Sequence, residues 1–454
     1  MAGTGRWGYN RIMRAAPEIF KAYDIRGIVP DELDAEAAEQ VGRAFAAEVK
    51  PKTAIVGRDV RLTGEKFREA LVTGLTKSGV DVIDIGQVST DEFYFACGSK
   101  DLPGIMITAS HNPPEYNGFK MVRKFPYLLL AKEFRTNVTD RTYPDAPTVG
   151  SVTEESITEA FIAKMLALVS PETIKPLKVV VDSSNGAQGP VWKQLAARLP
   201  IEMVELCFEP DGNFPNHVND VIQPESQEML RAKVRETGAD LGLIFDPDGD
   251  RCLAVDDRGV SVPGDWITAL LAVAQLKRTP GATVLYDVRA SDAVPDSVTA
   301  AGGLPFVWKP GHAYIKKEME DRKIAFGGEV SGHFYFQDFW YADCGTLAAL
   351  TMLQYVSQLN GPLSGKVKEF ESKYFLSGEI NSKVADRDAV LARVKKQYAD
   401  HIENELSGVA VRFPDWHFVV RPSDNEPLIR LTLEANSHEL METKRDELLK
   451  LIRE

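Results

Sequence analysis

One stretch decides the fold of this chain: Thr108-Ala109-Ser110-His111-Asn112-Pro113-Pro114-Glu115-Tyr116-Asn117-Gly118-Phe119-Lys120. Apolar residues 104–108 lead into it and predict a short buried strand, and its two prolines exclude a helix. Because a residue before proline is driven toward extended geometry, the loop has few conformations. Ser110 would be a reactive serine where a strand leaves a sheet, with His111 as a base and Lys120 as a cation within reach. The alternative is an ordinary turn with local Ser and Asn hydrogen bonds.

Strand-like and helical patterns alternate on both sides of this stretch. Residues 53–57 and 80–85 predict strands that flank a helix over 64–77. A strand–helix–strand unit predicts a parallel pair with a right-handed crossover. Similar units begin near residues 178 and 283, so we predict three similar mixed-sheet α/β domains.

The last part of the chain has a different pattern. Strand-like runs at 375–380, 409–413, 417–421 and 428–433 are interleaved with two helices, of which the second begins after Ser437 as N-cap. This predicts a C-terminal α+β domain with an antiparallel sheet. We place the four domains at residues 1–155, 156–262, 263–373 and 374–454.

Composition narrows the class of protein. A chain of 454 residues is too long for one core, and its net charge of −13 argues against nucleic acid as a partner. No apolar run approaches about 18 residues, and residues 1–16 lack the apolar segment of a secretory signal, so we expect a loose tail, no membrane partner and a cytoplasmic location. The four cysteines lie far apart without CxxC, which argues against a zinc site and disulfides, and Cys207 and Cys252 are expected to be core residues.

A second loop, Asp246-Pro247-Asp248-Gly249-Asp250-Arg251, follows the strand predicted at 241–245. Three carboxylates at alternate positions repel one another unless a cation neutralises them, and oxygen ligands suit Mg²⁺. An EF-hand also begins Asp-x-Asp-x-Asp, but it needs glycine where Arg251 stands and a helix before the loop. A haloacid dehalogenase phosphatase would use Asp246 as its nucleophile, although the third carboxylate is then unexplained. A solvated acidic turn is the remaining alternative.

Two further polar loops could bind a sugar phosphate. In Gly-Gly-Glu-Val-Ser-Gly-His, residues 327–333, Glu329 and Ser331 can accept from and donate to vicinal hydroxyls, and His333 can carry a proton near neutral pH. Arg421 with Ser423 and backbone amides would make a phosphate cradle. Each of these loops could instead be a plain polar turn.

Because the chain is acidic overall, an anionic ligand would need local cations. Arg26, before Gly27, has a guanidinium whose N–H groups can donate to a phosphate, although it could equally be a surface arginine in a turn. The candidate cations are Arg26, Lys120, Arg251, Arg289, Lys309 and Arg421.

Together the motifs resemble, in order, those of the α-D-phosphohexomutases, the family of phosphomannomutase and phosphoglucomutase. Residues 108–120 resemble the phosphoserine loop, 246–251 the metal loop, 327–333 the sugar-specificity loop and 421–427 the phosphate-binding loop. The resemblance covers nearly the whole chain and implies three related domains and a fourth. It implies interconversion of hexose 1-phosphate and 6-phosphate, of mannose or glucose, through a phosphoserine and a bisphosphorylated sugar.

The resemblance also implies roles for the matching residues. One Mg²⁺ per chain would be bound by Ser110, Asp246, Asp248 and Asp250, and a hexose bisphosphate would be the activator. The catalytic residues would be Ser110, Lys120, His333, His312 and Arg26. The substrate contacts would be Tyr23, His111, Arg251, Arg289, Lys309, Glu329, Ser331, Arg421, Ser423 and Asn425. The partner would be a phosphosugar, and the protein a monomer or homodimer.

The sequence departs from the family pattern at three places. Pro310 replaces the usual threonine between Lys309 and Gly311, and Arg289 stands where relatives often carry lysine, which removes a proton-transfer role there. Asp424-Asn425 replaces a (Gly/Asn)-Thr pair in the phosphate loop. The alternatives that stay open are a phosphoglucosamine mutase, a metal-dependent sugar phosphatase and a non-catalytic sugar-phosphate-binding protein.

Overall fold

The computed structural model describes residues 17–423 and 428–454. The expected N-terminal tail, 1–16, and the Asp424-Asn425 pair, with the substrate contact expected at Asn425, lie outside the described residues. Three sheets carry both parallel and antiparallel pairs, and the fourth is antiparallel, which confirms the predicted fold class. Among the helices of the described residues, none is long and apolar enough to cross a membrane.

The first domain forms a mixed sheet in the order β1-β5-β4-β2-β3-β7, with β6 paired to β5. Helix α2 has the limits that its apolar spacing predicts, because Phe67, Leu71 and Leu75 are all buried. The elements are η1 Pro17–Ile19, β1 Ile25–Ile28, α1 Ala35–Val49, β2 Thr53–Arg58, α2 Gly64–Lys77, β3 Asp81–Gln87, α3 Thr90–Lys100, β4 Gly104–Ile107, β5 Tyr116–Lys124, β6 Tyr127–Leu128, α4 Ala131–Thr139 and β7 Val152–Glu154.

The second domain has the sheet order β12-β11-β10-β8-β9, in which β8 pairs in parallel with β9 and β10, and β11 is antiparallel to β10 and β12. Its elements are α5 Thr158–Val169, η2 Pro171–Thr173, β8 Leu177–Asp182, α6 Gln188–Ala196, β9 Ile201–Leu206, η3 Pro224–Gln227, α7 Glu228–Thr237, β10 Leu241–Phe245, β11 Cys252–Asp256 and β12 Ser261–Val262.

The third domain repeats this plan in the order β14-β13-β15-β16-β17. Its elements are α8 Gly264–Arg278, β13 Thr283–Asp287, α9 Ala293–Ala300, β14 Leu304–Trp308, α10 His312–Arg322, β15 Phe326–Gly328, β16 Phe334–Phe336, η4 Gln337–Phe339, β17 Ala342–Asp343, α11 Gly345–Ser357 and α12 Leu363–Glu371. The strand expected at 324–326 is shifted, because the chain pairs through Gly328, where a Cβ would lie 2.3 Å from Thr268 of α8.

The fourth domain has the order β18-β23-β22-β21-β20, with β19 also paired to β23. The single strand expected at 375–380 is two strands, because Gly378 adopts a positive φ of 68° between them. Ser437 caps the last helix by accepting from Leu440 N–H, as predicted. The elements are β18 Phe375–Leu376, β19 Ile380–Lys383, α13 Arg387–Gln397, η5 Ala399–His401, β20 Ile402–Asn404, β21 Val409–Arg412, β22 Trp416–Pro422, β23 Leu428–Ala435 and α14 His438–Arg453.

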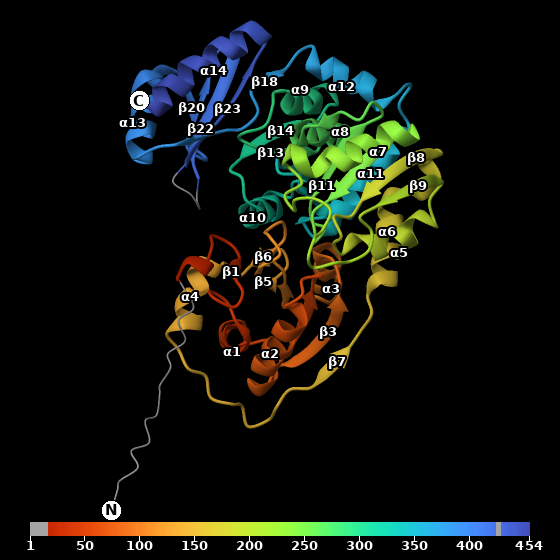
Figure 1. Ribbon diagram of the computed structural model, residues 1–454, viewed down its shortest axis with the longest axis vertical. Coiled ribbons are helices and arrows are strands. Elements are labelled where there is room, and N and C mark those ends of the chain that lie inside the picture. Colours follow the sequence, from red (N-terminus) through yellow and green to blue (C-terminus); the bar gives the residue numbers. More distant parts are fainter. Residues whose placement is uncertain (1–16, 424–427) are drawn as a thin grey trace, which may run out of the picture.

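The four domains are joined unequally. One buried apolar cluster runs through parts of the first three domains, whereas the fourth domain has a core of its own. The third and fourth domains meet through the small apolar cluster of Val288, Ala410 and Val419 and the two-bond ion pair of Arg412 with Asp292. The fourth domain, blue in Figure 1, thus lies at one end of the molecule, opposite the red and orange first domain across the site described below.

Candidate active site

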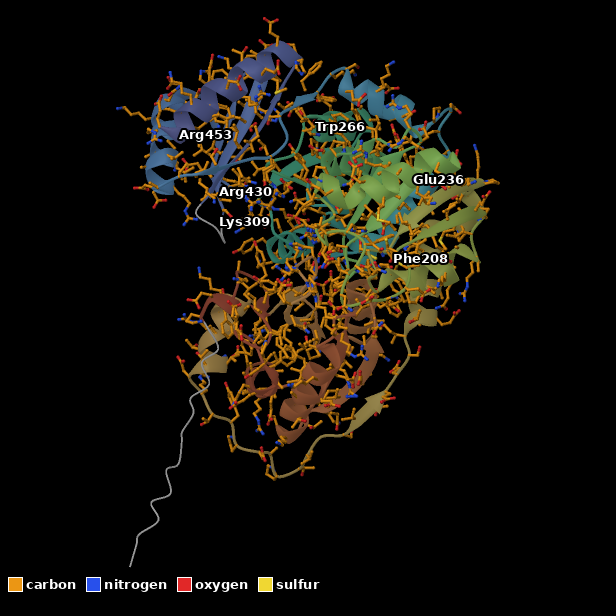
Figure 2. The ribbon with its side chains drawn as sticks, in the orientation of Figure 1. Phe208, Glu236, Trp266, Lys309, Arg430 and Arg453 are labelled. Atoms are coloured by element: carbon orange, nitrogen blue, oxygen red, sulfur yellow. The ribbon has the colours of Figure 1, made fainter. Side chains whose placement is uncertain are left out.

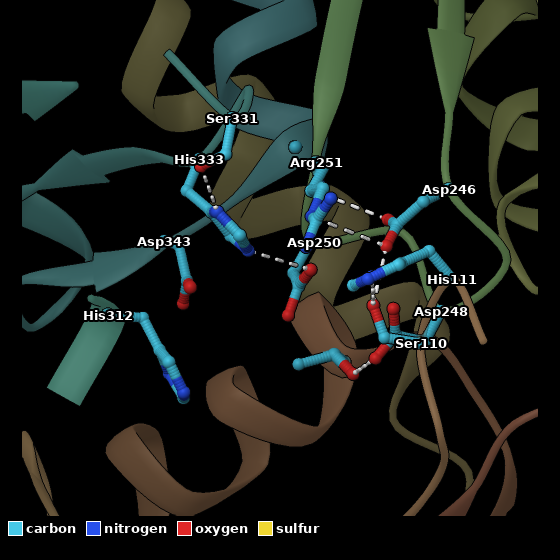
Figure 3. A network of polar contacts seen from close by, with 12 residues as sticks. Ser110, His111, Asp246, Asp248, Asp250, Arg251, His312, Ser331, His333 and Asp343 are labelled. Atoms are coloured by element: carbon cyan, nitrogen blue, oxygen red, sulfur yellow. Dashed lines mark hydrogen bonds and ion pairs between the residues drawn. The ribbon is translucent and has the colours of Figure 1, made fainter. Parts of the chain in front are cut away.

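Three site loops leave equivalent strands of the three α/β domains. In each sheet, parallel pairs, three in the first sheet and two in each of the others, are followed by two antiparallel pairs, and the loop joins the strands of the first antiparallel pair: β4 to β5, β10 to β11 and β15 to β16. Ligands in open α/β sheets bind at the carboxyl ends of strands. The loops meet, since Arg251 and His333 form a β-bridge and Figure 3 shows Ser110 close to the acids of the second loop.

Ser110 is held in the loop after β4 by backbone and side-chain contacts. Its φ is +47°, its N–H donates to Thr108 Oγ1 over 2.8 Å, and it is buried. The Oγ donates to Asp246 Oδ2 over 2.7 Å and lies 3.2 Å from His111 Nδ1 (Figure 3). An L-residue with positive φ is uncommon, and such backbone strain is found at functional sites.

Arg61, which the sequence did not single out, holds the serine loop in place. Its buried guanidinium donates to the carbonyls of Ser110, Asn112, Pro113 and Tyr116 over 2.6–2.7 Å. Those carbonyls are partly or fully buried and need donors. A lone arginine in a polar segment gives no sequence pattern for this role, because its partners are backbone atoms of a distant loop.

We expect Arg61→Met to destabilise the protein strongly. The change leaves the loop carbonyls and the buried Asp59 carboxylate, 3.3 Å from Arg61 Nε, without their cation. Removing one partner of a buried pair costs about 3–5 kcal/mol. Urea denaturation would measure this loss, with Arg58→Met as the matched control, because Arg58 makes exposed contacts to Glu65 and Gln87. Equal stability of the two variants would contradict the role of Arg61.

The three acids of the second loop converge, as a metal site requires. Asp246, Asp248 and Asp250 are buried, and their ligand oxygens lie within 4.8 Å of one another. Within the described part of the chain, Oδ1 of Asp248 and Oδ1 of Asp250 are buried without a hydrogen-bond donor. Carboxylate oxygens without donors, beside the Ser110 hydroxyl, fit an oxygen-liganded cation such as Mg²⁺.

Lys120 neutralises part of this charge. Its Nζ donates to Asp248 Oδ2 over 2.8 Å and also to Asp250 Oδ2. Burial, followed by repulsion from Asp248 and Asp250, raises the pKa of Asp246 well above its usual range. Burial acts in the same direction on Asp250, but Lys120 and His333 hold the pKa of that carboxyl well below its usual range. Burial opposes the charge of Lys120 too, yet its two acidic partners raise its pKa, so the ammonium stays protonated.

The third loop places its polar groups at the edge of the acid cluster. His333 Nε2 lies 3.5 Å from Asp250 Oδ1, and its Nδ1 lies 2.9 Å from Ser331 Oγ (Figure 3). Glu329 accepts from Gly311 N–H over 2.9 Å and from Tyr335 Oη. The ring of His312, labelled in the same view, stacks 6.4 Å from that of His333.

A cavity of about 610 Å³ opens above these loops. Its lining contains seven basic but three acidic side chains, which reverses the acidic balance of the whole chain. The basic residues are Lys21, Arg26, Lys120, Arg251, Arg289, Arg421 and Arg430. A field of this sign suits an anionic ligand. The expected contacts Tyr23, His111, His312, Glu329, Ser331 and His333 also line it.

Two expected substrate contacts do not line this cavity. Lys309 is absent from the lining, and its Nζ lies 3.6 Å from the centre of the Tyr314 ring. Ser423 is also absent from it, and its Oγ accepts from Arg430 over 3.4 Å. Figure 2 labels Lys309 on the third domain and Arg430 on the fourth, where the two domains face each other.

Arginines of the first domain and of the second loop are also anchored. Arg26 donates to Asn112 Oδ1 over 2.9 Å and to Asp24 over 3.0 Å, which fixes it beside the serine loop. Arg251 NH1 lies 3.5 Å from Asp220, and Arg289 pairs with Asp287 over 2.7 Å. These pairings leave the arginines oriented toward the cavity that they line.

The fourth domain contributes a pair of arginines, one of which the sequence analysis missed. Arg421 and Arg430 are directly opposed on β22 and β23, and Glu379 accepts from both over 2.9 Å. Like charges at opposed positions are unfavourable. Burial and the neighbouring Arg289 lower the pKa of Arg421, and its buried Nε has no acceptor among the described residues. An anion bound here would relieve the excess positive charge.

The chain is similar to known proteins over nearly its full length. It matches the descriptions "Phosphoglucomutase/phosphomannomutase, alpha/beta/alpha domain I" at 17–141, domain II at 159–259 and domain III at 263–374, and the family's C-terminal domain at 379–451.

Individual relatives agree with this assignment. A phosphomannomutase of Salmonella montevideo is 40% identical over 448 residues, 95% of this chain and 98% of the relative. A protein named "Phosphohexose mutases" from Xanthomonas campestris pv. campestris is 40% identical over 442 residues, 96% and 99% of the two chains. The crystal structure of a phosphoglucomutase/phosphomannomutase family protein from Burkholderia thailandensis has a TM-score of 0.87 at 32% identity, covering 96% and 97%. The chain therefore belongs to the phosphoglucomutase/phosphomannomutase family, with all four of the family's domains in order.

Proposed function

We propose that this protein is a phosphohexomutase that interconverts hexose 1-phosphate and hexose 6-phosphate through a phosphorylated Ser110. The observation that carries the proposal is the 2.7 Å contact of Ser110 Oγ with Asp246, inside a buried acid cluster at the floor of a basic cavity. A hydroxyl, a divalent-cation site and an anion-binding cavity in one place are what phosphoryl transfer needs.

Transfer from phosphorylated Ser110 to the sugar is balanced in atoms and protons. The bond between phosphorus and Ser110 Oγ breaks as a bond from phosphorus to the free sugar hydroxyl oxygen forms. The sugar loses a proton and Ser110 Oγ gains one, with His333 and His111 as relays, since His111 Nδ1 lies 3.2 Å from Oγ. Lys120 contributes fixed positive charge beside the transferring group. Mg²⁺ bound by Ser110, Asp246, Asp248 and Asp250 would supply charge neutralisation at the phosphoryl oxygens.

The second half of the reaction returns the other phosphate of the bisphosphorylated sugar to Ser110. The sugar must turn over within the site, so the distal phosphate needs a cradle that serves both orientations. Arg421 and Arg430, which line the cavity, would supply it in a separate domain, with Ser423 hydrogen-bonded to Arg430. Glu329 and Ser331 are placed to contact the sugar hydroxyls. A hexose bisphosphate is accordingly the activator that phosphorylates an unmodified Ser110.

Two alternatives are less well supported by the site. A phosphatase with Asp246 as nucleophile would need that carboxylate at the cavity surface, but Ser110 lines the cavity and Asp246 does not. In a phosphoglucosamine mutase the residue at position 330 would usually be glutamine, whereas this chain has Val330. We therefore propose mannose phosphate or glucose phosphate, or both, as substrates.

The function is tested by comparing mannose 1-phosphate, glucose 1-phosphate and glucosamine 1-phosphate, each with catalytic bisphosphate. We expect turnover of mannose or glucose phosphate and a protein-bound phosphate that is stable to acid and labile to alkali. A hydroxylamine-sensitive acyl phosphate would favour Asp246 as nucleophile. Binding without interconversion of any of the three sugars would favour a non-catalytic protein.

We expect Arg421→Met to weaken phosphosugar binding more than turnover. Its bond to a phosphate is charge-assisted and worth about 1.5–3 kcal/mol, so KM should rise roughly 10- to 150-fold. Steady-state kinetics would measure KM and kcat separately. Arg445→Met on α14 serves as the control, since Arg445 pairs with its neighbour Asp446 and does not line the cavity. An unchanged KM in the Arg421 variant would contradict the proposed cradle.

Several finer features remain predictions. They are one Mg²⁺ per chain, a monomer or homodimer, a cytoplasmic location and domain limits at residues 155, 262 and 373.

A further inference from the structure

A cluster outside the active site combines a thiol, an imidazole and a carboxylate. Asp182 ends β8, Cys207 follows β9 with a φ of +50°, and His217 lies on the loop that continues from it. Their ligand atoms all lie within 4.8 Å of one another. Cys207 is therefore not the core residue expected from its strand-like run, because the strand ends at Leu206 and the side chain turns toward His217.

The imidazole of His217 is oriented as in metal-binding histidines. Its Nδ1 lies 2.9 Å from Val218 O, and a carbonyl can only accept, so this nitrogen carries a proton. Metal-bound histidines commonly donate their second ring N–H to such a carbonyl, which fixes the other nitrogen as the ligand atom. His217 Nε2 lies 3.3 Å and 3.4 Å from the two oxygens of Asp182.

Asp182 supplies the second, independent observation. Its side chain is fully buried, and Oδ2 accepts no hydrogen bond from any residue that the structure describes. The other oxygen accepts from Ser184 N–H over 2.9 Å. A buried carboxylate oxygen without a hydrogen-bond donor is costly unless a cation faces it, and the 3.3 Å separation from His217 Nε2 shows that this oxygen favours a positive group, either an imidazolium or a metal ion in place of its proton.

We propose that Asp182, Cys207 and His217 form a second metal site, for a borderline-soft divalent ion such as Zn²⁺. Zinc lies about 2.0–2.3 Å from N, O and S ligands, so ligand atoms of a tetrahedral site are about 3.3–3.6 Å apart. The carboxylate–imidazole separation already has this value, and a small rotation of the Cys207 side chain closes the rest. Thiolate and imidazole favour zinc over magnesium.

The cysteine spacing argued against a zinc site because common zinc-binding motifs contain pairs of cysteines close together in the sequence, such as CxxC. This site has one thiol, and its other two ligands come from a different strand and from the middle of a loop.

Without metal, burial disfavours the charged ring of His217, yet hydrogen bonds to Asp182 and Cys207 raise the pKa of His217 to about 10. The metal would then replace the proton on Nε2.

A metal ion at this site would restrict the motion of the loop after β9, which reaches the active site. Two residues beyond His217, Asn219 donates to the Asn112 carbonyl of the serine loop over 2.9 Å. Asp220 follows, with its contact to Arg251. Phe214 belongs to the same loop, and the guanidinium of Arg61 from the first domain lies 5.2 Å from the centre of its ring. Phe208, labelled in Figure 2, marks where the loop begins. Metal at this place would stabilise the contact of the first domain with the second.

The test uses Co²⁺ as a probe on the full chain with excess Mg²⁺ present. We expect the near-ultraviolet charge-transfer band of a cobalt–thiolate bond at one Co²⁺ per chain, displaced by Zn²⁺. The active-site acids offer only oxygen, and among the described residues Cys207 is the cysteine that belongs to a metal-ligating cluster. The band should be lost in Cys207→Ser and His217→Gln and kept in Glu209→Gln, a variant of the same loop whose exposed side chain pairs with Lys193 of α6.

Two further measurements test the proposed metal site even if one of the variants fails to fold. X-ray absorption of the zinc-loaded wild-type protein should show one sulfur neighbour, and Zn²⁺ should raise the melting temperature of the wild type but not of Cys207→Ser. No thiolate band in the wild type, a band that survives Cys207→Ser, or zinc with only oxygen and nitrogen neighbours would each overturn the proposal. None of these outcomes depends on mutase activity, so they are independent of the proposed function.

Discussion

Ser110→Ala should abolish interconversion of hexose phosphates while leaving the protein folded. In the proposed mechanism Ser110 Oγ accepts the phosphoryl group, so without this oxygen neither half of the reaction can proceed. We expect turnover to fall roughly 10⁴-fold or more, the scale of loss when a nucleophile is removed from an enzyme. Coupled assay of the 1- to 6-phosphate conversion, with bisphosphate supplied, measures this directly, and labelled bisphosphate should no longer phosphorylate the protein.

The matched control is Ser170→Ala. Ser170 has a φ of +53° and is exposed at the end of α5, so the control imposes a similar backbone strain away from the cavity. Activity of this variant should equal that of the wild type. Equal turnover by the Ser110 and Ser170 variants would reject the phosphoserine mechanism.

Asp246→Asn should separate metal binding from folding. The carboxylate is buried beside two others, so its neutral replacement relieves repulsion when no metal is present. In EDTA we expect a melting temperature at or above that of the wild type. In Mg²⁺ the wild type should be stabilised and the variant should not. Metal charge neutralisation is worth several kcal/mol, so a loss of about 4 kcal/mol would lower turnover roughly 10³-fold.

Asp256→Asn provides the comparison for this variant. Asp256 is also a buried aspartate of the second domain, at the end of β11, where it accepts from Arg258 and Val260 N–H. Its substitution should lower the melting temperature equally in EDTA and Mg²⁺, because no metal is near it. A Mg²⁺-dependent shift that persists in Asp246→Asn would exclude that acid as a ligand.

Much of the fold could be predicted because its patterns are local. The helix over Gly64–Lys77 and the strand Leu241–Phe245 have the predicted limits, since apolar spacing and flanking turn residues decide both. The limits near Phe326 and Gly378 were wrong, because the pairing of Gly328 and the break between β18 and β19 depend on partners distant in the sequence.

The residues missed in the site share one physical property. Arg61 acts through carbonyls of a loop that lies far along the chain, and Arg430 acts by facing Arg421 across a strand pair. Neither lies in a motif that the sequence analysis singled out, so residue type and spacing carry no information about its role. The cluster of Asp182, Cys207 and His217 was missed for the same reason, because its ligands come from three separate segments.

The sequence alone determined the class of each domain and picked out the candidate site loops, because strand periodicity, prolines and alternating acids are properties of neighbouring residues. Tertiary structure decided what those loops form together. Only the shared strand order of three sheets brings Ser110 to Asp246 and Asp250 to His333. Only packing removes the acids from water, which is the condition that makes a bound cation favourable there.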